Sequence, residues 1–149
     1  MIKHGSKMIQ AVANANVPQI TVMCGASFGA GNYGMCGRAY QPRFLFSWPN
    51  AQTAVMGAEQ AALTMAIVME AAMKRRGQEV DRRQIEGVKA KIVENFEAQS
   101  SAFVTSGRML DDGIIDPRDT RNVLGLALAI CKDADARVLR PVQFGVARP

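Results

Sequence analysis

An apolar run that leads into a turn of small residues constrains the fold of this chain more than any other feature. Residues 20–24 are apolar and partly β-branched, and residues 25–37 contain five glycines. This pattern predicts a buried strand, a tight turn and a short helix from Asn32 to Gly37. The first backbone N–H groups of such a helix lack partners, and the helix dipole adds positive charge there. Because small side chains let a ligand oxygen come close, the turn is predicted to form a main-chain cradle for an anion or oxyanion.

Two other interpretations of this turn stay open at the level of sequence. Gly29, Gly31 and Gly34 spell G-x-G-x-x-G after a strand, which is the fingerprint of a dinucleotide-binding fold. That fold also needs an acidic residue about 20 positions further on, for the ribose hydroxyls. The first acidic residue of the chain is Glu59, so the dinucleotide interpretation is disfavoured. In the remaining alternative, the glycines only permit close packing.

The charge of the chain is distributed unevenly. Residues 1–58 carry four of the 18 Lys and Arg residues and none of the 13 carboxylates, so they account for most of the net charge of +5. A positive first third favours an anionic small molecule as ligand. Basic runs interleaved with aromatic residues are absent, which argues against nucleic-acid binding. The length of 149 residues is enough for one domain with a sizeable core.

The cysteines and the apolar segments bear on metal binding and on location. Cys24, Cys36 and Cys131 have no C-x-x-C spacing, and the chain has one histidine. We therefore expect free thiols in a reducing compartment and no metal site. Residues 1–15 lack the apolar run and cleavage signal of a secretory leader, and no segment reaches the ~18 apolar residues of a membrane span. Neither secretion nor a membrane is expected.

Helices alternate with short strands along the chain, which predicts an α/β fold with a small parallel sheet. Helical patterns cover residues 1–15, 57–73, 84–97 and 119–131; strand patterns cover residues 20–24, 44–48 and 53–56, with a further short strand at 111–117; a charged connection covers 74–83, a short helix or loop 100–109, and an irregular tail 133–149. The helix that begins at Gly57 again follows a strand. Its start is therefore expected to face the same cavity as the cradle.

Few side chains are suited to acid–base or nucleophilic chemistry. Gly25–Gly29 matches the G-x-S-x-G motif with Ser27 as nucleophile, but that motif needs a later histidine, and the only histidine is His4. Three aspartates at positions 111, 112 and 116 could bind a hard cation, although turn and capping roles are more common for such residues. Catalysis by backbone donors fits this inventory better. Removal of one oxyanion donor typically costs ~10²–10³ in rate, and the base would then come from the substrate, a cofactor or another chain.

Five segments together resemble a known enzyme family. They are residues 27–38 (SFGAGNYGMCGR), 42–44 (PRF), 48–51 (WPNA), 55–61 (VMGAEQA) and 111–126 (DDGIIDPRDTRNVLGL), and residues 144–146 (FGV) are similar to the family's C-terminal tail. The family is the carboxyltransferase (β) subunit of biotin-dependent acyl-CoA carboxylases, in the branch of methylcrotonoyl-CoA and geranyl-CoA carboxylases. The resemblance covers nearly the whole chain, and residues 63–83 match less closely than their flanks.

The resemblance implies a crotonase-like half-domain and a specific role for the cradle. It identifies the turn Gly29–Gly31 with the family's second oxyanion hole, which holds the ureido oxygen of biotin carried on a partner domain. Ala30 and Gly31 would be the two catalytic N–H donors. The biotin-binding residues would be Phe28, Gly29, Ala30, Gly31, Tyr33, Gly57 and Ala58. Biotin that has released CO₂ can then act as the base, which agrees with the lack of a protein base.

The family subunit has two crotonase-like halves, and residues 1–149 resemble the C-terminal one, incomplete at its N-terminus. The resemblance implies as partners a biotin carboxylase/carboxyl-carrier subunit, the N-terminal half that binds acyl-CoA, and other β subunits. It implies a cytoplasmic location in a bacterium, which we favour, and the mitochondrial matrix in a eukaryote. The fragment alone is expected to be inactive. Two alternatives stay open: a non-catalytic assembly module, and a crotonase-type acyl-CoA hydrolase or isomerase.

Overall fold

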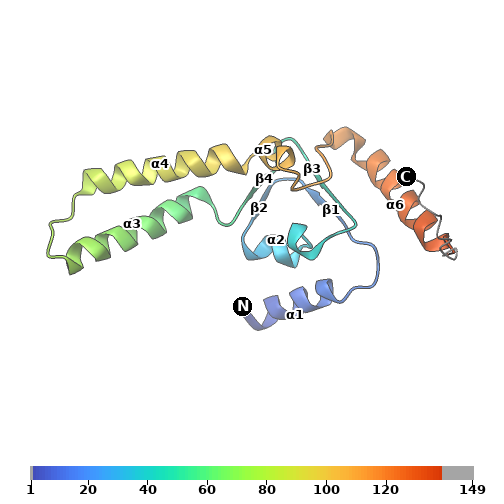
Figure 1. Ribbon diagram of the computed structural model, residues 1–149, viewed down its shortest axis with the longest axis horizontal. Helices are drawn as coiled ribbons and strands as arrows, with labels where there is room; N and C mark the ends of the chain where they lie inside the picture. The colour runs from blue at the N-terminus through green and yellow to red at the C-terminus, as the bar shows by residue number, and fades with distance from the viewer. Residues whose placement is uncertain (1, 139–149) are drawn as a thin grey trace, which may run out of the picture.

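The computed structural model describes residues 2–138 as short parallel strands flanked by helices (Figure 1). In chain order the elements are α1 (Ile2–Ala13), β1 (Ile20–Met23), β2 (Ala26–Phe28), α2 (Ala30–Gly34), the 3₁₀ helix η1 (Arg38–Tyr40), β3 (Phe44–Ser47), β4 (Gln52–Ala54), α3 (Ala58–Arg75), α4 (Arg82–Ser100), α5 (Ala102–Gly107), the 3₁₀ helix η2 (Pro117–Asp119) and α6 (Thr120–Ala136). The predicted α/β class and the parallel pairing are both confirmed. The predicted tail segment at residues 144–146 lies outside the described residues.

The strands form two parallel pairs instead of one sheet. β1 pairs with β3 and β2 pairs with β4, and each pair is two-stranded. Two hydrogen bonds link the segments that connect the pairs: the Trp48 N–H donates to the Met23 carbonyl at 2.9 Å, and the Gln52 N–H donates to the Gly25 carbonyl at 3.2 Å. Strand β2 is a correction to the sequence prediction, which assigned these residues to the turn. Three residues between glycines carry no periodic signal, and their strand conformation depends on a partner 26 residues away.

A small core lies under the first strand pair. Met23, Leu45, Ala51 and Ala102 are buried together, and Ile114 packs against them. The segment before Ile114 runs along β3: the Asp112 N–H donates to Leu45, and the Ser47 N–H donates to Gly113. The strand predicted over residues 111–117 is wrong in extent, since only the single bridge from Ser47 to Ile114 forms. The proline at position 117 has no N–H with which a ladder could continue.

Helices α3 and α4 form a long antiparallel hairpin that projects to one side of the strands, while α6 lies on the other side (Figure 1). Helix α4 starts two residues before its predicted bound because Asp81 caps it, with Oδ1 accepting from the N–H groups of Arg83 and Gln84 at 2.9 and 3.2 Å. Helix α6 continues to Ala136 instead of ending near residue 131. A carboxylate–guanidinium pair one turn apart, Asp133 to Arg137 at 2.6 Å, lies at its end.

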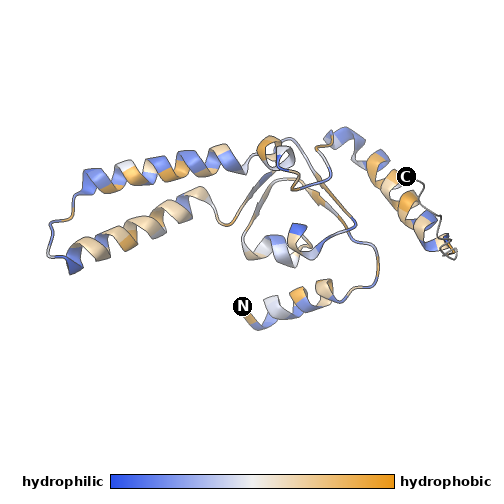
Figure 2. Cartoon of the chain, viewed as in Figure 1, coloured by the Kyte–Doolittle hydropathy of each residue, from blue (hydrophilic) through white to orange (hydrophobic). Residues whose placement is uncertain are grey.

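Hydrophobic residues recur along α3 and α6 (Figure 2), and several of their side chains are exposed. The exposed set includes Leu63, Met65, Ile67 and Val68 on α3, and Leu126, Leu128 and Ile130 on α6. These runs are interrupted by small or polar positions. Within residues 2–138, no helix combines the length and the apolar character that crossing a bilayer requires.

Replacement of Gly87 by alanine is expected to stabilise the chain. Gly87 lies inside α4, is exposed, and a Cβ built on it meets no atom within 4 Å. Alanine loses less backbone entropy than glycine in a helix interior, so the free energy of unfolding should rise by about 0.5–1 kcal/mol. Urea denaturation followed by circular dichroism measures this, and an unchanged or lower midpoint would contradict the open environment described for Gly87.

Candidate functional site

The turn between β2 and α2 has a backbone that only glycine adopts readily. Gly29 caps α2 with φ 55° and ψ −135°, in the positive-φ region that L residues with a side chain rarely enter. A Cβ on this residue would lie 3.0 Å from the carbonyl oxygen of Val55. The helix that follows begins at Ala30 and ends at Gly34. The predicted bounds, Asn32 to Gly37, are wrong because the turn closes earlier and the chain leaves the helix at Cys36, which has φ 54°.

The backbone N–H groups of Ala30 and Gly31 at this turn donate to no acceptor in the part of the chain that the structure describes, residues 2–138. Ala30 and Gly31 are the first two residues of α2, positions whose N–H groups cannot bond within the helix. The amides on either side are used: Gly29 donates to Ala54 and Asn32 donates to Gly29, both at 3.2 Å. Ala30 and Gly31 are exposed, and a Cβ on Gly31 would meet nothing within 4 Å. The turn therefore offers a pair of adjacent, accessible donors.

The parallel pairing of β2 with β4 brings the two strand-to-helix turns to one edge. Phe28 pairs with Ala54, so the turn that leads to α2 and the turn that leads to α3 start side by side. Phe28 and Ala58 line one cavity of about 220 Å³. Gly29, Ala30, Gly31, Tyr33 and Gly57 are not part of its lining. The ring of Tyr33 packs edge-on against Tyr40, with 6.0 Å between centroids.

This cavity corrects one expectation about charge. The sequence around the cradle has no carboxylate before Glu59, yet Glu59 and Glu97 both line the cavity of Phe28 and Ala58. Glu59 lies in the first turn of α3, where the helix dipole favours a negative charge. Glu97 comes from α4, which packs against α3, and this proximity cannot be read from sequence spacing. The turn of Ala30 and Gly31, at the same edge of the β2–β4 pair, has no ionisable side chain of its own.

Ser27 is not placed as a nucleophile. A nucleophile elbow puts its serine on the sharp bend after a strand, whereas Ser27 lies inside β2, paired with Thr53. Its Oγ accepts a hydrogen bond from the side-chain amide of Asn32 at 2.8 Å. His4 is exposed on α1, in another element. The sequence analysis named Asn32 only as the expected start of a helix and gave its side chain no role; the bond to Ser27 depends on the fold of the turn and has no signal in the sequence.

The three cysteines and the aspartates at positions 111, 112 and 116 were the remaining candidates for chemistry. All three cysteines are free: Cys24 is exposed, and Cys36 and Cys131 are buried. Burial raises the pKa of the Cys36 thiol, and a hydrogen bond with Thr21 opposes that shift to a smaller extent. The predicted capping role is confirmed for Asp116, whose side chain accepts from the Arg118 N–H at 2.9 Å. The guanidinium of Arg118 lowers the pKa of this carboxyl. Within residues 2–138, no cluster of three or more His, Cys, Asp or Glu side chains is arranged to hold a metal ion.

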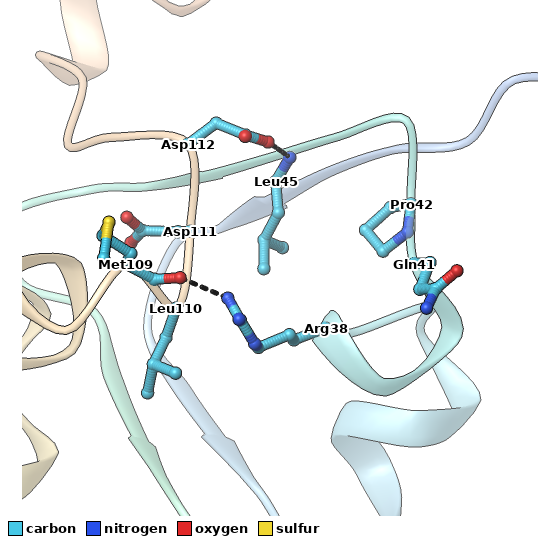
Figure 3. Close-up of a pocket in the computed structure, with 8 residues that line it drawn as sticks. All are labelled: Arg38, Gln41, Pro42, Leu45, Met109, Leu110, Asp111 and Asp112. Carbon is cyan, nitrogen blue, oxygen red and sulfur yellow. Dashed lines mark hydrogen bonds between the residues drawn. The ribbon is translucent and has the colours of Figure 1, made fainter.

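A second cavity, of about 280 Å³, lies between η1, β3 and the segment after α5 (Figure 3). Its polar groups are largely used to hold the chain. Asp112 accepts from the Leu45 N–H at 2.8 Å, Asp111 accepts from the Ser47 hydroxyl at 2.5 Å, and the Arg38 guanidinium donates to the Met109 carbonyl. None of the predicted site residues lines this cavity. Its contacts therefore fasten residues 109–113 to η1 and β3.

Comparison with known proteins identifies the family. Residues 1–143 match the model of the carboxyl transferase domain. The chain belongs to the carboxyl transferase domain family. It is 51% identical over 148 residues to the probable biotin-dependent acyl-coenzyme A carboxylase beta2 subunit of Mycobacterium tuberculosis, covering 99% of this chain and 28% of that one. It is 52% identical over 146 residues to the probable mitochondrial methylcrotonoyl-CoA carboxylase beta chain of Drosophila melanogaster, covering 98% and 25%.

Solved carboxyltransferase structures have the same fold. The geranyl-CoA carboxylase beta subunit of P. aeruginosa superposes with a TM-score of 0.86 at 49% identity, covering 98% of this chain and 27% of that chain. A transcarboxylase 12S structure gives a TM-score of 0.69 at 33% identity, covering 99% and 26%. The crotonase-like α/β class predicted from the sequence is thus confirmed. The chain spans about a quarter of the length of these relatives.

Proposed function

We propose that this chain is the biotin-side, C-terminal half of an acyl-CoA carboxylase carboxyltransferase. In this role it would help to transfer a carboxyl group from carboxybiotin to a branched, unsaturated acyl-CoA. 3-Methylcrotonyl-CoA is the favoured acceptor, and geranyl-CoA is the second. Relatives named for each of these two substrates are about half identical to this chain. The observation that carries the proposal is the pair of adjacent amides, Ala30 and Gly31, without an acceptor at an exposed turn.

The turn fits a ligand oxygen that carries negative charge. Two N–H donors at a helix start provide hydrogen bonds and partial positive charge without any titratable group. Gly31 leaves open space beside them. The bound biotin group would supply the transferable carboxyl and, after its loss, a base. The part of this chain is to hold the ureido oxygen with the N–H groups of Ala30 and Gly31, and to form the rim of the site with Phe28, Gly29, Tyr33, Gly57 and Ala58.

The two fixed donors would stabilise a ligand oxygen on which negative charge develops. If the ureido group of biotin were bound here, the N–H groups of Ala30 and Gly31 would bind its oxygen more strongly the more negative it became. Donors that belong to a folded turn need no reorientation when the charge develops. The carboxylates of Glu59 and Glu97 line the cavity of Phe28 and Ala58, whose lining does not include Ala30 or Gly31.

The test is carboxylation by a complete system. The chain is combined with an N-terminal carboxyltransferase half and a biotinylated carboxylase–carrier subunit, and carboxylation of 3-methylcrotonyl-CoA and geranyl-CoA is measured with ATP and bicarbonate. We expect activity that needs all components and that avidin abolishes, and no activity from the chain alone. Acyl-CoA turnover that avidin leaves intact would overturn the proposal in favour of a crotonase-type hydrolase or isomerase.

We further propose that the chain works inside an oligomer with other β subunits and a biotin-carrying partner. The exposed apolar side chains of α3 and α6 support an assembled state, since water-exposed runs of this kind are typical of interaction surfaces. The related transcarboxylase 12S protein forms a hexamer assembly. A bacterial cytoplasm is the favoured location, and a mitochondrial matrix is the alternative that the mitochondrial Drosophila relative suggests. If the chain associates with these partners but the complete system shows no carboxylation, a non-catalytic assembly role is the better interpretation.

A further inference from the structure

The side chain of Asn32 fastens the first turn of α2 to strand β2. Its Nδ2 donates a hydrogen bond of 2.8 Å to Oγ of Ser27, and both side chains are partly buried. The main chain of the same residue closes the turn, because the Asn32 N–H donates to the Gly29 carbonyl at 3.2 Å. Ala30 and Gly31 lie between these two attachments. Asn32 thus fixes the turn with its backbone and ties it to the strand with its side chain.

Gly37 leaves the space that the Asn32 side chain occupies. A Cβ built on Gly37 would lie 1.8 Å from Oδ1 and 2.4 Å from Cγ of Asn32. The Gly37 N–H also donates to the Asn32 carbonyl at 2.7 Å. The backbone of Gly37 has φ −70° and ψ −176°, which any residue can adopt. Glycine is therefore needed here for space, and the space is filled by the Asn32 amide.

We propose that Asn32 is a positioning residue, which sets the direction of the Ala30 and Gly31 N–H groups through its bond to Ser27. The inference rests on the proposed function of that amide pair. A helix of five residues has little stability of its own, so contacts outside the helix must hold its first turn. Displacement of catalytic donors by about 1 Å can reduce a rate by ~10²-fold. The hydrogen bond to Ser27 is the side-chain contact that opposes such a displacement.

Kinetics in the complete carboxylase test the role. Asn32→Ala and Ser27→Ala should each lower kcat by roughly 10- to 100-fold, within the range for misplaced donors, with little change in KM for acyl-CoA. The double variant should be no worse than either single one, because all three lose the same bond. Ser27→Thr keeps the hydroxyl and should restore most of kcat. Gly37→Ala should resemble Asn32→Ala, since its Cβ displaces the amide.

The matched control is Asn16→Ala, at an exposed position between α1 and β1, which should leave kcat unchanged. An Asn32→Ala enzyme with kcat within twofold of this control would overturn the inference. So would a double variant whose effect equals the product of the single effects.

A second readout separates this inference from the proposed function. In ¹⁵N-labelled chain, Ser27→Ala removes the bond without changing a residue adjacent to the pair; it should move the amide resonances of Ala30 and Gly31 and leave that of Gly87 in place. Unchanged Ala30 and Gly31 resonances would overturn the positioning role whatever the amides bind. Conversely, full activity after loss of the Ala30 N–H would overturn the proposed function, while the resonance shifts would still report the positioning role.

Discussion

Ala30→Pro is expected to lower kcat of the reconstituted carboxylase by ~10²–10³, the cost typical for loss of one oxyanion donor. The substitution removes the N–H and puts the ring Cδ of proline in its place. Proline is well tolerated at the first position of a helix, where the amide has no helical partner, and Ala30 holds that position in α2. The residue before it is Gly29, which has no Cβ to clash with the proline ring. The fold of the turn should therefore persist.

The kinetic pattern is as informative as the size of the effect. If the donor acts only as charge develops, kcat and kcat/KM for acyl-CoA should fall together, with KM nearly unchanged. Steady-state carboxylation at varied acyl-CoA gives both parameters. The matched control is Arg82→Pro, which places proline at the first position of α4, distant in sequence from the cradle. The role of the turn is refuted if the two proline variants have equal kcat.

The sequence was sufficient for the elements whose signal is local. The apolar run of β1, the amphipathic pattern of α4 and the glycine before α3 each predicted an element within a few residues of its bounds. These signals are local because a strand, a helix face and a helix cap are encoded by neighbouring residues. The same local reasoning, joined to the family resemblance, placed the candidate donors at Ala30 and Gly31.

The features that were missed depend on residues far apart in the chain. Strand β2 exists because β4 pairs with it, and residues 111–117 form one bridge instead of a strand because β3 accepts only part of them. The hydrogen bond between Asn32 and Ser27 joins a helix to a strand that was itself not predicted. Glu97 reaches the cavity of Phe28 from the second helix of the α3–α4 hairpin. Tertiary contacts of this kind leave no periodic pattern in the sequence.

Gly29→Ala is expected to destabilise the chain by about 1–3 kcal/mol, the cost of holding a residue with a side chain in a sparsely populated backbone region. The strain has two sources at this position: φ is 55°, and the added Cβ would lie 3.0 Å from the Val55 carbonyl oxygen. Relief of either one requires the β2–α2 turn to move away from β4. The N–H of Gly29 would then lose its bond to Ala54.

Chemical denaturation of the chain measures this loss, and Gly25→Ala is the matched control. Gly25 lies in the same segment, but a Cβ on it meets nothing within 4 Å and its φ lies outside the positive region. Alanine there should change the free energy of unfolding by less than about 0.5 kcal/mol. Because Gly29 also sets the entry to Ala30 and Gly31, Gly29→Ala should lower kcat of the complete enzyme as well. Equal denaturation midpoints for the two variants would show that the turn does not require the conformation described for Gly29.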